Sequence, residues 1–297
     1  METRLFISFL LVAYSIIFPT IFCNAAEEKI LFSSSSSGIW QVWTVNPDGS
    51  NLSQLTQGQE DAHHPASSPD GSRIAYVNNE GEISAMPIGK EPQKLKFIPK
   101  NCNHPAWSPK GKRLAFVCYS FRDRREESDI WIADLDESRV WKLLEQEGIQ
   151  SYPTWSPDGS EIAYTTGYRV GSDKIVEELW LVGIDGKNPK PLVLDSFSNV
   201  HPDWSPDCGK IAFASNRSGS MDIWVVDRSG KNRKRLTDDK SYDAHPSWSP
   251  DGSEICFTST RGGKMDIWVI ESDGKNPRQV TGLTDSQGES KEPKWSR

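Results

Sequence analysis

The chain has 297 residues, of which 25% are charged and 36% are hydrophobic, and this composition excludes a disordered protein. Its formal net charge of −7 argues against nucleic acid as the main partner, because phosphate binding requires a basic surface. After residue 26 the sequence contains no apolar run of the roughly 18 residues that a membrane span needs.

The N-terminal 26 residues have the pattern of a secretory signal peptide. Residues 5–22 are almost wholly apolar, and the small residues of Asn24-Ala25-Ala26 follow them where a signal peptidase could cut. We therefore expect residues 1–26 to be removed and the mature chain to act in the periplasm or outside the cell. Two alternatives stay open: the apolar run is retained as an anchor, or Cys23 is lipidated, although Phe22 stands where a lipobox has a small residue.

Export makes disulfide bonds possible. Cys102 and Cys118 flank a short turn at residues 109–112, so they lie nearly opposite each other if this segment is a hairpin, and they are the candidate disulfide. We expect no bridge between Cys208, which lies in a turn, and Cys256, which lies in a strand one repeat later. The spacings match no zinc-binding pattern.

One phrase recurs along the chain, and its clearest copy runs from His245 to Thr281. It reads His-Pro-x-Trp-Ser-Pro-Asp-Gly, then an Ile-Ala-Phe element, then Asp-Ile-Trp-Val, then Asp-Gly-x-Asn. The second element begins six times, in steps of 44, 40, 48, 49 and 44 residues, at Ile30, Ile74, Leu114, Ile162, Ile211 and Ile255. Each copy holds four short apolar stretches separated by turn residues, which is typical of one blade of a β-propeller.

The repeat predicts an all-β, six-bladed propeller over residues 27–297. The first copy lacks the strand that contains Trp-Ser-Pro, and the chain ends on that strand, at residues 292–297. We therefore expect the C-terminal strand to join the first blade and close the ring, which removes open sheet edges. Ten of the twelve tryptophans recur at two repeat positions and are assigned to packing, whereas Trp40 and Trp141 fall outside the repeat.

This repeat resembles the TolB-type PD40 repeat, a relative of WD40, over residues 29–297. The resemblance implies the six-bladed propeller of the TolB C-terminal domain. Because the first blade starts three residues after the expected cleavage point, we expect no room for the α/β domain that precedes the TolB propeller. Of the family's roles, the resemblance then implies docking of a protein partner in the cell envelope, such as the peptidoglycan-associated lipoprotein.

The candidate site lies on one face of the propeller. The loops between second and third strands should share that face with the start of each inner strand, and they are longest in the third and fourth blades. Four histidines precede the repeated proline, and Tyr152 and Glu292 hold the equivalent position in the other two blades. The expected mouth of the central channel comprises His64, His104, Tyr152, His201, His245 and Glu292, with loop residues Arg122, Arg169, Arg217 and Arg261.

Three interpretations of these histidines stay open. They cap the inner strands, or they bind a transition metal together with a carboxylate, or they form an anion pocket with the arginines. The metal interpretation draws on a resemblance to oligogalacturonate lyases, which use channel histidines for a metal. The sequence contains no nucleophile elbow, P-loop or Rossmann glycine motif.

We therefore predict a monomeric, non-catalytic scaffold without cofactor or metal, which binds a protein or, as the second option, a cell-wall glycan at this face. The alternative is a metal-dependent carbohydrate-active enzyme, a lyase or hydrolase, that uses the channel histidines. A purely structural surface array is a third hypothesis.

Overall fold

The computed structural model describes residues 28–122, 125–170, 174–282 and 288–296. The described residues contain strands and turns and no helix, which confirms the all-β prediction. None of them lies in a helix that could cross a membrane. The expected signal peptide, residues 1–26, lies outside the described residues.

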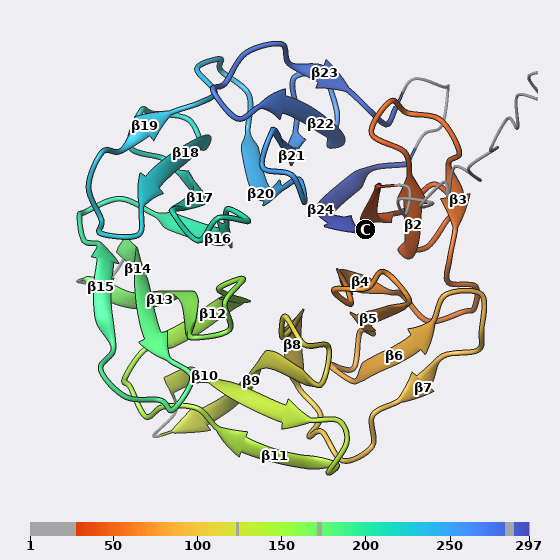
Figure 1. Cartoon of the computed structure of the whole chain (residues 1–297), viewed down its shortest axis with the longest axis vertical. Coiled ribbons are helices and arrows are strands. Elements are labelled where there is room, and N and C mark those ends of the chain that lie inside the picture. The colour runs from red at the N-terminus through yellow and green to blue at the C-terminus, as the bar shows by residue number, and fades with distance from the viewer. Residues whose placement is uncertain (1–27, 123–124, 171–173, 283–287, 297) are drawn as a thin grey trace, which may run out of the picture.

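The strands follow one another in sets of four that are arranged around a central axis (Figure 1). The strands nearest the axis are β4 (His63–Ser67), β8 (Cys102–Trp107), β12 (Ile149–Trp155), β16 (Asn199–Trp204), β20 (Asp243–Trp248) and β24 (Ser290–Ser296). The second strands are β1 (Lys29–Ser34), β5 (Arg73–Val77), β9 (Arg113–Arg122), β13 (Glu161–Val170), β17 (Lys210–Ser215) and β21 (Glu254–Ser259). The third strands are β2 (Gln41–Val45), β6 (Ile83–Pro87), β10 (Arg125–Asp134), β14 (Lys174–Gly183), β18 (Asp222–Asp227) and β22 (Asp266–Glu271). The outermost strands are β3 (Ser53–Gln54), β7 (Gln93–Lys94), β11 (Arg139–Lys142), β15 (Lys190–Val193), β19 (Lys234–Arg235) and β23 (Arg278–Gln279).

The C-terminal strand belongs to the first set. β24 pairs antiparallel with β1, so the sheet order is β24-β1-β2-β3, and β24 also contacts β20 and β4. The sets β8–β11 and β12–β15 form one eight-stranded sheet, because Ser128 of β10 forms a parallel bridge with Ile149 of β12. The other three sets are separate four-stranded sheets.

The hydrophobic core lies between neighbouring sets. Because each sheet is covered on both faces, the second strands read as continuous apolar runs; five of the six residues of β17 are buried. Aromatic side chains recur at one position of these strands and are fully buried, namely Phe32, Phe116, Tyr164, Phe213 and Phe257. Such repeated burial of large side chains is the main stabilising term of the fold.

The long loops predicted in the third and fourth repeats are extended hairpins. Strands β9, β10, β13 and β14 have ten residues each, whereas β17 and β18 have six. The additional residues continue the antiparallel ladders beyond the neighbouring sheets. They place Phe121, whose side chain is 81% exposed, at the end of β9.

Cys102 and Cys118 are joined by a disulfide bond between β8 and β9, where they are direct cross-strand partners. Among the described residues, Cys208 and Cys256 are free. The disulfide closes a loop of 16 residues, and chain-entropy arguments give such a loop about 3 kcal/mol of stabilisation.

We expect the double substitution Cys102→Ser and Cys118→Ser to lower the free energy of unfolding by about 3 kcal/mol, because it removes this restraint on the unfolded chain. Urea denaturation followed by circular dichroism measures the change. Reducing agent should destabilise the natural protein by a similar amount and leave the double variant unchanged; an equal response of both proteins would contradict the prediction.

Candidate functional site

Each inner strand has the same local irregularity at its X-Pro pair. The antiparallel ladder slips by one residue there in all six inner strands, for instance between Val200 and Asp203 of β16. The residue before the proline has a positive φ, between 50° and 59°, in every case. Proline has no N–H group to donate to the hydrogen-bond ladder, and a bulge redirects a side chain. The side chain of the residue before each proline therefore leaves the alternation of the strand.

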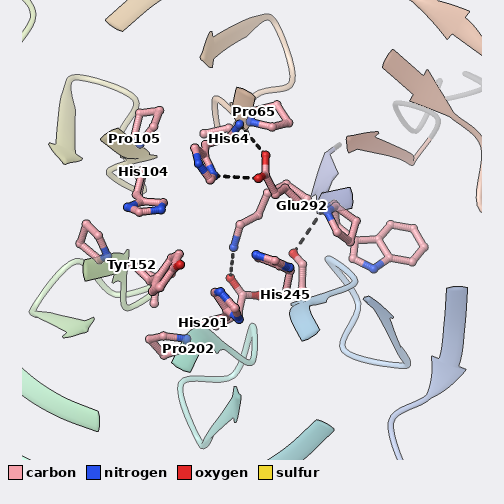
Figure 2. A pocket seen from close by; sticks show the side chains of 18 of the residues that line it. His64, Pro65, His104, Pro105, Tyr152, His201, Pro202, His245 and Glu292 are labelled. Carbon is pink, nitrogen blue, oxygen red and sulfur yellow. Dashed lines mark hydrogen bonds and ion pairs between the residues drawn. The ribbon is translucent and has the colours of Figure 1, made fainter. Parts of the chain in front are cut away.

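The six residues before these prolines line one central cavity of about 260 Å³ (Figure 2). Their rings lie side by side around it, with centroid distances of 4.4 Å for His64–His104, 4.2 Å for His104–Tyr152, 4.2 Å for Tyr152–His201 and 3.7 Å for His201–His245. Glu292 completes the set, because its Oε1 lies 3.3 Å from Nδ1 of His64. We call these six residues the mouth ring: His64, His104, Tyr152, His201, His245 and Glu292.

Glu292 is held by three groups besides the His64 ring. Its Oε2 accepts hydrogen bonds from the backbone N–H of His64 at 2.8 Å and from the Ser33 hydroxyl at 3.1 Å. The Lys291 ammonium lies 3.2 Å from Oε1. Burial raises the pKa of Glu292, but His64, Lys291, His245 and the His64 backbone outweigh it, so the pKa lies well below the usual range. The mouth ring therefore carries one ionised carboxylate.

The imidazoles of the mouth ring are neutral. Burial depresses the pKa of His64, His104, His201 and His245 below the ordinary histidine value, for His245 to about 4. The neighbouring histidines add to the depression for His104 and His201, whereas Glu292 opposes it for His64 and His245. At neutral pH the histidines therefore supply no positive charge for an anion.

The hydrogen bonds of the histidines distinguish the three interpretations further. Nδ1 is buried without a hydrogen-bond partner in His104, His201 and His245. A capping role would give these atoms backbone partners, and only His64 pairs its Nδ1 with another residue of the ring. No group of three or more His, Cys, Asp or Glu side chains within the described ranges is arranged to hold a metal ion.

Two of the four predicted arginines, Arg217 and Arg261, are paired with aspartates and do not line the central cavity. Arg217 pairs with Asp195 at 3.0 Å, and its guanidinium lies over the rings of Phe213 and Trp224. Arg261 makes the equivalent contacts in the next set, to Asp239 at 3.0 Å and over Phe257 and Trp268, and it also pairs with Asp243 at 2.6 Å. These repeated contacts anchor loops to the sheets. Arg169 is exposed on β13, and Arg122 lies in β9 with its side chain outside the described part of the structure.

Sequence reasoning missed an ion pair in the lining of the same cavity. Lys294 of β24 reaches Asp203 of β16, with Nζ 2.9 Å from Oδ1. The other carboxylate oxygen of Asp203 accepts a hydrogen bond from the backbone N–H of Trp248 at 2.9 Å. Each of the two residues directly follows the proline of an X-Pro pair, and the other copies of the repeat have an uncharged residue at this position. These two charges were the signal from which the ion pair could have been predicted.

The repeat and the fold agree with one family of known proteins. The family model described as PD40, TolB beta propeller domain, matches residues 29–178 and 177–297. The chain belongs to the TolB β-propeller family. This confirms the resemblance seen in the repeat.

The relatives agree with this assignment. A Protein TolB homolog of Chlorobium luteolum is 28% identical over 148 residues, which is 50% of this chain and 33% of that protein. The match thus spans about one third of the length of that curated relative. The crystal structure of TolB from Acinetobacter baumannii superposes with a TM-score of 0.73 and 22% identity, over 90% of this chain and 66% of the other. An oligogalacturonate lyase in complex with manganese has a TM-score of 0.60 and 18% identity, over 85% of this chain and 73% of the other. Both structural similarities concern the fold.

Proposed function

We propose that this protein is an exported, non-catalytic scaffold that binds a protein partner of the cell envelope at the face containing the mouth ring. In this proposal residues 27–297 form one six-bladed propeller whose ring is closed by β24, and the protein acts as a monomer. Export rests on the signal peptide expected at residues 1–26. The envelope partner rests on membership of the TolB β-propeller family.

One observation carries the proposal: the mouth-ring face combines a cavity lined by imidazoles, three of which have a buried Nδ1 without a partner, with exposed apolar side chains around it. Exposed large hydrophobic residues on the extended hairpins and on the connections into the inner strands are Phe121, Tyr168, Val170, Ile175, Phe197 and Tyr242. Exposed apolar groups beside a cavity mark binding surfaces in soluble proteins. A rigid scaffold that positions such loops is the usual arrangement for recognition.

A metal-dependent carbohydrate-active enzyme is supported only by the fold that this chain shares with the lyase. The described residues of the mouth ring provide no metal cluster, and two of the arginines that an acidic sugar would need, Arg217 and Arg261, are paired with aspartates. We therefore favour the binding function.

The test compares two exposed apolar residues on opposite faces. Phe121 lies on the mouth-ring face, and Leu52 lies beside the turn between β2 and β3 on the other face and is also exposed. Residues 27–297 with an affinity tag, and the variants Phe121→Glu and Leu52→Glu, are used to capture proteins from an envelope extract. Captured proteins are identified by mass spectrometry.

We expect Phe121→Glu to reduce capture of a specific partner at least tenfold, since a charge buried in an interface is costly, and Leu52→Glu to have no effect. Equal melting temperatures show that both variants are folded. Equal loss in both variants, or no specific partner in any experiment, would contradict the proposed function.

A further inference from the structure

Trp40, which lies outside the repeat, forms a cation site with two residues of the C-terminal strand. The Lys291 ammonium lies 4.4 Å from the centroid of the Trp40 ring and 3.2 Å from Oε1 of Glu292. The ring of His63 lies beside Trp40 at a centroid distance of 5.7 Å. An ammonium between an indole face and an ionised carboxylate is the arrangement by which proteins recognise organic cations.

This site forms part of a cavity of about 510 Å³ that shares five residues with the mouth ring, namely His64, Tyr152, His201, His245 and Glu292. The charged residues in its described lining are three carboxylates and one ammonium, namely Glu177, Glu289, Glu292 and Lys291. Its aromatic residues besides the histidines are Trp40, Tyr152 and Tyr242. The cavity therefore has an excess of negative charge and several electron-rich ring faces. Among its described lining residues the ammonium of Lys291 is the single positive charge.

Acceptors for further N–H groups of a cation are available nearby. A neutral imidazole has one ring nitrogen that accepts a hydrogen bond. Nδ1 of His201 and Nδ1 of His245 are buried without partners, and both residues line the cavity, with only 9% of His201 exposed. An unpaired buried polar atom costs free energy, which a ligand that pairs it recovers.

We propose that this cavity binds an alkylammonium group carried by a peptide segment of the partner, and that Lys291 is the resident occupant which the incoming group displaces. The inference rests on the proposed function, because it takes the ammonium to belong to the docked protein. The same chemistry occurs in free polyamines, so the experiment includes one.

The probe is the peptide acetyl-Lys-Lys-Lys-amide, with acetyl-trinorleucine-amide and acetyl-triglutamate-amide as neutral and acidic controls. Binding is followed at pH 7.5 by carbon–proton NMR of the histidine rings, of which the chain has five. We expect only the lysine peptide to shift the signals of His245 and His64. Spermidine serves as the free-amine probe, and we expect it to bind more weakly, because it buries no peptide against the apolar residues around the cavity.

Two lysine variants test the displacement. Lys291→Met should tighten binding of the lysine peptide about fivefold, since the competing cation–π contact and ion pair are worth about 1 kcal/mol. Lys275→Met removes an exposed lysine on the opposite face and controls for the change in net charge. Equal affinities of these two variants would overturn the role of Lys291.

The carboxylate and the indole are tested in the same way. Glu292→Gln should weaken binding at least tenfold, and Trp40→Leu provides a second variant outside the inner strands in case Glu292→Gln does not fold. Binding of the glutamate peptide, or tighter binding of spermidine than of the lysine peptide, would contradict the proposal. If the Phe121-dependent partner is captured and the lysine peptide does not bind, this inference fails and the proposed function stands. If the lysine peptide binds and no Phe121-dependent partner is captured, the proposed function fails and the cavity still binds an alkylammonium group.

Discussion

A chain that ends at Glu289, and so lacks strand β24, is expected to lose most of its stability and to aggregate. β24 pairs with β1 and contacts β4, β20, β21 and β22, so its removal exposes surfaces on five strands. Its Trp295 side chain is only 9% exposed, and the loss of one such buried aromatic costs about 3–5 kcal/mol. The whole free energy of unfolding of a domain is about 5–15 kcal/mol. The unpaired edge of β1 would then be free to pair with other chains.

Size-exclusion chromatography and thermal unfolding measured by circular dichroism test this expectation. The truncated chain should elute as aggregate and show no cooperative transition, and a synthetic peptide of residues 289–297 should restore part of the transition. Trp295→Ala is a milder companion that should fold and lose about 3–5 kcal/mol. A truncated monomer that melts within a few degrees of the full chain would show that β24 contributes little.

Acidification from pH 7.5 to pH 5 is expected to destabilise the protein before most carboxylates titrate. The histidines of the mouth ring have a lower pKa in the folded state than in the unfolded state, for which the ordinary value is about 6.5. Between these values the unfolded state binds more protons, so the contribution to stability is complete above about pH 6.5 and is lost as the pH falls. For His245, with a pKa of about 4, the loss is on the order of 2 kcal/mol at pH 5 and approaches about 3 kcal/mol below pH 4.

Glu292 acts in a different pH window. Its pKa is lowered in the folded state, so its contribution is present above the unfolded value of about 4.5 and is lost only below it. A decrease between pH 7.5 and pH 5 therefore reports on the histidines. The charged groups that face them are Glu292, which favours their protonation, and Lys291 and Lys294, which oppose it.

Urea denaturation of the natural protein, His245→Asn and His63→Asn at several pH values measures this effect. Asparagine tolerates the positive φ of position 245, so the substitution does not add backbone strain. His245→Asn should reduce the loss at pH 5 by about 2 kcal/mol, and His63→Asn, which alters the histidine outside the mouth ring, should change it less. A pH dependence that is the same in all three proteins would contradict the assignment.

The strand pattern, the turns and the sheet partner of the C-terminal strand could be predicted from the sequence. These features depend on short local signals that are repeated, so each copy strengthens the interpretation of the others. The pairing of Cys102 with Cys118 followed from the same hairpin logic, because a short turn fixes which residues lie opposite.

The sequence predicted which residues form the mouth ring, but it did not predict their neighbours or their charge. A one-residue bulge breaks the alternation of a strand, so residue parity does not reveal which way His201 or Glu292 points. The sequence placed the histidines beside arginines, whereas the tertiary structure pairs Arg217 and Arg261 with aspartates and leaves the imidazoles against one another. Burial then decides their charge, and burial is a property of the packed ring of sheets.

The sequence by itself therefore determined that this protein is an all-β repeat of the TolB propeller family, because periodic apolar stretches and turn residues act locally. Only the tertiary structure decided the character of the site. Trp40 and Lys291 are separated by 251 positions in the chain and meet because β24 joins the sheet of β1 and β2. Contacts between such distant residues depend on how the sheets pack around the axis, and no local pattern specifies them.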